Sequence, residues 1–267
     1  MKQIYLLIVL LYSSQYAFAD ITIKYKDLLS GKPAYGLEYS IRGNQLKFVE
    51  TGSSRVNIFN AKNTSFISYD PQTGKRALFN EQILDQRVRE FNQRRLKKLS
   101  AVEKDLEKHL KTMTEKEQEV GQSLINLLKY PDLYGKHTLL KITPMPQQKQ
   151  IDNISCQSYQ LHREKQLLKE YCLADASSLN MSTEEYRTLR RFYAFDYAMQ
   201  TRLMLALGQT DFSLVDYDQQ KMPGVIIETI RYKHDQPVQH LILDGFHKQP
   251  LKNTDFSLNI PKGTENP

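Results

Sequence analysis

Tryptophan is absent from the 267 residues and cysteine occurs only twice, so sixteen tyrosines and eleven phenylalanines supply the aromatic side chains. Hydrophobic residues make up 40% of the chain and charged residues 25%. These proportions are typical of a globular protein with enough apolar material for a hydrophobic core. The length fits one large domain or two small ones.

The sequence also lacks the short motifs of the common enzyme classes. It has no G-x-S-x-G elbow, Walker loop, G-x-G-x-x-G turn or H-E-x-x-H helix. The nearest approach to a metal-binding cluster is His234, His240, Asp244 and His247. His240 and His247 face opposite sides of a regular strand, unless Gly245 marks a bulge. We therefore expect a protein that is not an enzyme and that has neither a metal site nor a cofactor.

An isolated block of basic residues is missing too. The 37 Lys and Arg exceed the 30 Asp and Glu, but acidic residues are interleaved with the basic ones. This distribution is typical of a solvated surface rather than of a binding patch. We expect no nucleic-acid partner.

The first residues have the pattern of a signal peptide. Lys2 supplies a positive charge, residues 4–11 form an apolar core, and Ala-Phe-Ala at 17–19 is a small-x-small cleavage site before Asp20. A membrane anchor is the alternative, but the apolar core is much shorter than the roughly 20 residues that span a bilayer.

We therefore predict a signal peptide at 1–19 and one domain at 20–267 that does not span a membrane. No cysteine lies near the cleavage site to carry a lipid, and removal of Lys2 lowers the net charge from +7 to +6. We expect a soluble protein of the periplasm, with secretion from the cell as the alternative.

The two cysteines, Cys156 and Cys172, bracket one polar-centred segment, and export would place them where disulfides form. Alternating residues on both sides of the charged sequence HREKQ predict a hairpin. A turn centred on Glu164 would place the cysteines directly opposite each other, at a separation that suits a disulfide. The alternative, a redox-active pair, usually needs C-x-x-C spacing. We predict a structural disulfide.

The same register predicts the faces of this hairpin. Tyr159, Leu161, Leu167 and Tyr171 would share an inward-facing side. The cysteines would share the other, wetter side with Ser158, Gln160 and Glu170.

Residues 34–79 alternate between apolar and polar side chains, with Gly, Asn and Pro breaks about every ten residues. This pattern predicts an antiparallel meander with one dry face. GVIIETIRY (224–232), the turn KHDQP and VQHLILDGF (238–246) predict a further hairpin, and FSLNIPKG predicts a last short strand that ends at Pro261 and Gly263.

Residues 81–129 switch to a helical period. A single helix would be roughly 75 Å long, which is too long for one compact domain. Capping-box sequences at Ser100-x-x-Glu103 and Thr114-x-x-Glu117 indicate two or three helices, with one overhanging helix as the alternative. Residues 81–129 include 11 basic and 9 acidic residues, and the charged face that they form is either solvated or docks a partner.

A second helix is predicted to begin at Ser182-x-x-Glu185 and to end at Gly208. Its stripe either faces the core or contacts a ligand, and consists of Tyr186, Leu189, Tyr193, Tyr197, Leu203 and Leu207.

Three stretches together resemble the LolA-like superfamily of periplasmic proteins. They are the meander YSIRGNQLKFVETGSSRVNIFNAKNTSFISYDPQTGK, the hairpin NISCQSYQLHREKQLLKEYCLADASSLNMS and the ending TDFSLNIPKG. The resemblance implies an α+β fold in which helices cover the concave side of a curved antiparallel sheet, an incomplete barrel. In carrier members that cavity holds lipoprotein acyl chains. The helical region 81–129 is not part of the carrier pattern.

We expect a binding protein whose half-barrel holds an apolar ligand such as a lipid or acyl chain. Tyr39, Phe48 and Ile58 are the predicted lining residues; alternatively, they pack on the protein's own helices. A second hypothesis is an envelope scaffold protein that docks a protein partner through 81–129.

Overall fold

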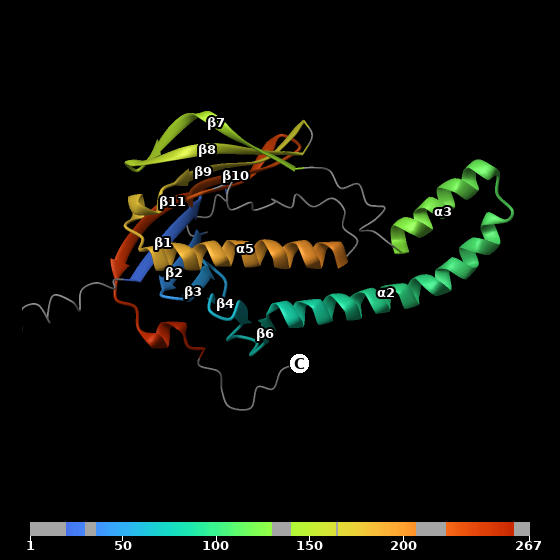
Figure 1. The fold of residues 1–267 in the computed structure, drawn as a ribbon, viewed down its shortest axis with the longest axis horizontal. Helices are drawn as coiled ribbons and strands as arrows, with labels where there is room; N and C mark the ends of the chain where they lie inside the picture. Colours follow the sequence, from blue (N-terminus) through green and yellow to red (C-terminus); the bar gives the residue numbers. More distant parts are fainter. Residues whose placement is uncertain (1–19, 30–35, 130–139, 164, 207–222, 259–267) are drawn as a thin grey trace, which may run out of the picture.

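The computed structural model describes residues 20–29, 36–129, 140–163, 165–206 and 223–258. The signal peptide predicted at 1–19 lies outside these residues. In this part of the chain, eleven strands form one antiparallel sheet (Figure 1). The strands are β1 Asp20–Asp27, β2 Gly36–Arg42, β3 Gln45–Glu50, β4 Val56–Asn60, β5 Ser65–Tyr69, β6 Arg76–Phe79, β7 Leu140–Ile151, β8 Ile154–Arg163, β9 Gln166–Ala174, β10 Val225–Lys233 and β11 Gln236–Gln249.

Each half of the sheet is a meander, and β1 lies at the centre. The strand order is β6-β5-β4-β3-β2-β1-β11-β10-β9-β8-β7, so β1 pairs with β2 on one side and with β11 on the other. The edge strands β6 and β7 do not pair with each other, which leaves the sheet open. The prediction of an open antiparallel sheet with helices is confirmed.

The meander predicted over 34–79 is confirmed as β2–β6. Gly43 and Gly52 lie in two of its turns with φ of 51° and 84°. Both values fall in the left-handed region that glycine adopts without steric cost. The turn at DPQTG is fixed by Asp70, whose carboxylate accepts hydrogen bonds from the Ser54 hydroxyl at 2.8 Å and the Gln72 amide at 3.0 Å.

Two strands were not predicted from the sequence. β1 follows the predicted cleavage site directly; it lies at the centre of the sheet, and its residues Ile21, Thr22 and Ile23 are all buried. β7 contains Pro144 and Pro146, which a central strand would not tolerate; β7 is an edge strand, where proline is accepted.

The prediction of a last strand that begins at Phe256 is wrong at its first residue. Asn253–Phe256 forms a short 3-10 helix, η3, with Phe256 buried. The Asp255 carboxylate accepts a hydrogen bond from the Lys252 amide at 2.8 Å and so caps this turn. Pro261 and Gly263 lie outside the described residues.

The helix predicted from Ser182 is confirmed as α5, Thr183–Ala206, after a short 3-10 turn, η2, at Ala176–Leu179. The Glu185 amide donates to the Ser182 hydroxyl at 3.3 Å, and the Ser182 amide donates to the Glu185 carboxylate at 2.6 Å. These two bonds form the predicted capping box. The predicted end at Gly208 lies outside the described residues. α5 lies in the concavity between the two halves of the sheet (Figure 1).

The region 81–129 consists of two helices, α2 Glu81–Leu110 and α3 Glu115–Lys129. The predicted break at Thr114 is confirmed: its amide and hydroxyl both donate to the Glu117 carboxylate, at 2.9 and 2.7 Å. Ser100 does not break α2; its hydroxyl donates to the Lys97 carbonyl within the helix.

The N-terminal part of α2 packs against the body, where Leu84 is buried and Arg202 of α5 binds Asp85 at 3.0 Å. Beyond this N-terminal part, α2 extends away from the sheet, and α3 folds back along α2 (Figure 1). We call residues 88–129 the arm. Of the described helices, none is both long and apolar enough to cross a membrane.

Candidate functional site

The predicted disulfide between Cys156 and Cys172 is confirmed. It joins β8 to β9 with the two Cα atoms 5.4 Å apart. Disulfides persist in oxidising compartments, so this bond is compatible with an exported protein.

The predicted register of this hairpin is wrong by two residues. Cys172 lies opposite Ser158, not opposite Cys156. Next to the turn, Arg163 pairs with Gln166, so each residue of β8 faces a residue one position later in β9 than predicted. The bulged residue Leu168 adds a second position to this offset. The disulfide therefore runs diagonally across the ladder.

The faces of the hairpin follow the prediction with two corrections. Tyr159 and Tyr171 lie opposite each other, on the face away from the cysteines. Leu167 does not share this face, because the bulge turns Leu168 toward it instead. The cysteines do not lie in a wet environment: they are 3% and 0% exposed and belong to the main hydrophobic cluster.

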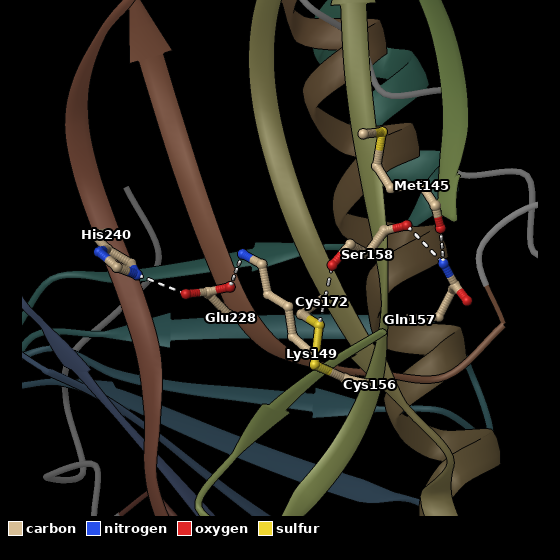
Figure 2. The surroundings of a disulfide bond; sticks show 8 residues. All are labelled: Met145, Lys149, Cys156, Gln157, Ser158, Cys172, Glu228 and His240. Carbon is tan, nitrogen blue, oxygen red and sulfur yellow. Dashed lines mark hydrogen bonds and ion pairs between the residues drawn. A yellow bond between two sulfur atoms is a disulfide. The ribbon is translucent and has the colours of Figure 1, made fainter. Parts of the chain in front are cut away.

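A polar network lies beside the disulfide (Figure 2). Glu228 of β10 accepts a hydrogen bond from Lys149 at 2.9 Å and pairs with the ring of His240 at 3.0 Å. The Glu228 side chain is only 10% exposed. Three strands, β7, β10 and β11, thus meet at one buried carboxylate.

Glu228 is ionised despite its burial. Burial alone would raise the pKa of this carboxyl group, but the hydrogen bonds from Lys149 and His240 together hold its pKa below the usual value. The network therefore acts as a structural anchor between strands.

The predicted ligand-lining residues do not form one site. Tyr39 and Phe48 lie on the concave face, where their rings are 6.0 and 5.4 Å from the ring of Phe192 in α5. Ile58 lies on the opposite face, because it pairs with Lys47, the neighbour of Phe48 in β3. At Tyr39 and Phe48, α5 itself covers the sheet.

The main hydrophobic cluster extends this packing across β1–β5 and includes buried residues of β8–β11. Phe192 and Phe195 are 5% and 6% exposed and contact Phe59 of β4. The sequence pattern placed the α5 stripe on Tyr186, Leu189 and Tyr193 and missed both phenylalanines. Their spacing of three residues, flanked by Leu189, is the signal that could have revealed them.

Buried tyrosines border the main cluster. Tyr25 donates a hydrogen bond from its hydroxyl to the Ile226 carbonyl at 2.6 Å. Burial raises the pKa of Tyr25 and of Tyr39 well above the usual tyrosine value. Both side chains therefore stay neutral and can act as hydrogen-bond donors.

A second hydrophobic cluster lies on strands β7–β10. Its side chains are nearly inaccessible, and no residue of α2, α3 or α5 belongs to it in the described part of the chain. Register places Tyr171 opposite Thr229 and Thr229 opposite Leu241, so the cluster lies on the face of β8 and β9 that points away from the disulfide. We call it the second cluster, and it consists of Tyr159, Leu161, Leu168, Tyr171 and Leu173, with Ile142 and Ile226 packed against it.

Two basic residues adjoin the second cluster. Leu161 pairs with Lys169, and Lys169 pairs with Arg231. Leu161 is fully buried, Lys169 is half-buried and Arg231 is exposed. Burial, together with the charge of Arg231, lowers the pKa of Lys169. The sequence pattern did not single out either residue, because their pairing depends on the register between β9 and β10.

The histidines considered as metal ligands have another arrangement. A bulge at Asp244 brings His240 and His247 to the same face. This is the arrangement expected if a bulge lies near Gly245. His240 is bound to Glu228. Within the described ranges, no three His, Cys, Asp or Glu side chains are grouped so that they could hold a metal ion.

Comparisons with known proteins give no assignment. No family model matches the chain, and no curated protein matches it. Among solved structures, the chain is similar to "Structure of PNGF-II in C2 space group", with 8% identity, a TM-score of 0.39, and 89% of this chain and 29% of that chain covered. It is also similar to an uncharacterized conserved protein from Thermus thermophilus, with 3% identity, a TM-score of 0.38, and 94% of this chain and 92% of that chain covered. The chain thus spans less than a third of the length of PNGF-II.

Proposed function

We propose that this protein is a non-catalytic binding protein of the periplasm that holds a lipid or acyl chain on the concave face of its open sheet. The resemblance of three sequence stretches to the LolA-like superfamily supports this function, and so does the open antiparallel sheet with a helix in its concavity. The ligand site that we propose differs from the one expected at Tyr39 and Phe48, where Phe192 already occupies the space.

The observation that carries the proposal is the second cluster. A sheet face needs a covering layer, and α5 supplies it only for the main cluster. Leu161, Tyr159 and Tyr171 instead belong to an apolar cluster to which no described helix contributes. Apolar and aromatic side chains with a few polar groups are typical of pockets for lipid-like ligands. These side chains are nearly inaccessible in the ligand-free protein, so ligand binding requires them to become accessible.

Native mass spectrometry of protein purified from the envelope under mild conditions tests the proposal. We expect bound species whose masses match acyl lipids, and palmitate binding after their removal. Ile142→Gln, at the rim of the second cluster, should weaken palmitate binding by about tenfold, since a polar amide replaces buried apolar surface. Tyr39→Phe, within the main cluster, is the matched control and should bind normally. A delipidated protein that binds no palmitate would overturn the proposal.

Export to the periplasm is part of the proposal, with secretion as the alternative. The intact mass of the protein from the envelope fraction should correspond to a chain that begins at Asp20 and has lost two hydrogens to the disulfide. A cytoplasmic protein that retains residues 1–19 would contradict this location.

A second candidate function is docking of an envelope protein through the arm. Most of the large apolar side chains exposed among the described residues lie there: Phe91, Leu96, Met113, Val120 and Leu124. Val120 and Leu124 are one helical turn apart on α3 and are 66% and 49% exposed. An exposed apolar helix face of this kind fits the groove of a partner protein.

Removal of the arm's outer part tests this second candidate. Glu103 and Lys129 form an ion pair, so a short Gly-Ser linker can replace residues 104–128. We expect the truncated protein to fold and to lose a cross-linked partner that the full chain captures in the envelope. The double variant Val120→Ser, Leu124→Ser should lose the same partner. Retention of the partner by both proteins would exclude the arm as the docking surface.

A further inference from the structure

One side of α2 carries two neighbouring rows of positive charges. Residues that follow each other at steps of three, four or seven positions share one side of a helix. Glu90 and Asp105 are the acidic residues on this side between positions 87 and 108, so six positive and two negative side chains give it a net charge of +4. We call it the cationic face. Its six cations are all exposed: Arg87, Arg94, Lys97, Lys98, Lys104 and Lys108.

The cationic face points away from α3. Glu103 forms an ion pair with Lys129 of α3, so its position marks the side of α2 that faces α3. Lys98 and Lys108 lie five residues before and after Glu103, and five residues turn a helix by about 140°. The helical period therefore separates Glu103 from cations with which it is interleaved in the sequence.

Most charges of the cationic face lack a carboxylate partner. Arg94 lies 3.5 Å from Glu90 and Lys108 lies 4.0 Å from Asp105, with the two basic side chains 77% and 80% exposed. Exposed pairs of this kind contribute little to stability. The other four cations form no ion pair within 4.0 Å with a carboxylate of the described residues: Arg87, Lys97, Lys98 and Lys104. The face thus keeps a positive potential that an external anionic partner would neutralise.

We propose that the cationic face of α2 docks on an anionic membrane surface. Between Arg87 and Lys108 the face extends for about 30 Å, at about 1.5 Å per residue. This length exceeds a single phosphate or carboxylate and fits a surface that presents many anionic head groups. Each cation close to such a surface strengthens binding by about fivefold. The inference goes beyond the function proposed above and does not depend on the binding of an acyl chain.

Phe91 favours a membrane over a soluble polyanion as the partner. It follows Arg87 by four residues and precedes Arg94 by three, so it lies in one of the cationic rows, and it is 38% exposed. Helices that lie in a membrane interface combine Lys and Arg with side chains such as Phe, which leave water among the lipid head groups. The charged backbone of a soluble polyanion offers no apolar layer for this ring.

Co-sedimentation of the protein with lipid vesicles tests the proposal. Vesicles of phosphatidylcholine and phosphatidylglycerol should bind it at least about tenfold more tightly than vesicles of phosphatidylcholine alone, and added salt should weaken this binding by screening the charges. The triple variant Lys97→Gln, Lys98→Gln, Lys104→Gln should weaken it by about a hundredfold, since three cations are lost. Glutamine is as good a helix former as lysine, so α2 should stay helical in circular dichroism.

A charge-matched variant is the control. Arg55→Gln, Lys62→Gln, Lys75→Gln removes three exposed cations from the turns of the first meander and should bind the anionic vesicles like wild-type protein. Equal losses in the two triple variants would indicate a general charge effect and overturn the proposal. Palmitate binding should be unchanged in both, so a failure of membrane docking is distinguishable from a failure of the acyl-chain function.

Heparin, a soluble polyanion, distinguishes the remaining alternative. Phe91→Gln should weaken binding to the anionic vesicles by about threefold, because part of the ring no longer leaves water, and should leave heparin binding unchanged. An equal effect on both ligands would contradict the placement of Phe91 in the membrane interface. A wild-type protein that binds heparin but not the anionic vesicles would assign the cationic face to a soluble polyanion and refute the membrane.

Discussion

At the scale of single residues, the anchor is Glu228, a carboxylate held ionised inside the sheet. Its two partners come from different strands, and neither is adjacent to it in sequence. Removing one of the three side chains of this network leaves a buried polar or charged partner without its hydrogen bond. The resulting loss of stability is larger than the net stabilisation that the intact network provides. Substitutions here report on stability rather than on ligand binding.

Glu228→Gln should therefore destabilise the protein by about 1–3 kcal/mol, the usual cost of losing hydrogen bonds to a charged group. Urea unfolding at neutral pH measures the loss. Glu38→Gln, on an exposed pair with Lys24, is the control and should change the free energy of unfolding by less than about 1 kcal/mol.

The same carboxylate predicts a pH dependence. The pKa of Glu228 is lower in the folded protein than in the unfolded chain. Its contribution to stability is therefore complete above the unfolded value of about 4.3 and is lost as the pH falls through the folded value. Between about pH 5 and pH 3, wild-type protein should lose more stability than Glu228→Gln. Parallel curves for the two proteins would contradict this assignment.

Phe192 is the residue at which α5 closes the main cluster. Phe192→Ala should cost about 3–5 kcal/mol, the range for deletion of a buried aromatic ring. Phe91→Ala on the arm removes a ring that is 38% exposed and should cost less than about 0.5 kcal/mol. Chemical denaturation of both variants compares the two positions directly.

At the scale of elements, the signals that depend on a few neighbouring residues predicted the structure well. The capping boxes at Ser182 and Thr114 mark the beginnings of α5 and α3, and the turns between Gly43 and Gly74 separate the strands of the first meander. The Ser100 sequence has the same spacing but lies inside α2, because a capping box requires an unpaired first turn and this one continues an existing helix.

Thr114→Ala tests the break between α2 and α3. Loss of the cap should destabilise α3 by about 1 kcal/mol, so that amide exchange in residues 115–129 becomes about fivefold faster. Ser100→Ala is the matched control, since this residue lies within a continuous helix, and exchange around it should stay unchanged. Hydrogen exchange with peptide-level mass spectrometry resolves both segments.

The candidate site could not be predicted from the sequence, for a physical reason. The residues of the second cluster and the pair Lys169–Arg231 come together through strand register. Between β8 and β9 this register depends on the bulge at Leu168, and between β9 and β10 on the irregularity between Ile226 and Glu228. A strand that gains one residue exchanges its two faces beyond that point. The alternation pattern alone therefore placed Leu167 inward, although the structure places it on the other face. Ile58 was wrongly grouped with Tyr39 in a region without a bulge, because the register of β4 against β3, which pairs Ile58 with Lys47, was not known.

At the scale of the whole molecule, the disulfide links the strands that lie next to the β7 edge of the sheet. Its removal by Cys156→Ser and Cys172→Ser should cost about 3 kcal/mol, the value expected when the loop between them is no longer closed in the unfolded chain. Urea unfolding of the oxidised protein and of the double variant measures this cost. Thiol titration of native protein should detect no free sulfhydryl group.

The position of β1 has a consequence for synthesis and folding. Ile21 pairs with Lys248, so the middle of the sheet joins segments from near the two ends of the described chain. A growing polypeptide therefore cannot complete its sheet until almost all of its sequence has been made, and such non-local pairing folds slowly. Until then, the inner edge of β1 offers unsatisfied backbone groups to any other strand. Loss of the C-terminal β10–β11 hairpin should consequently produce aggregates rather than a smaller folded protein.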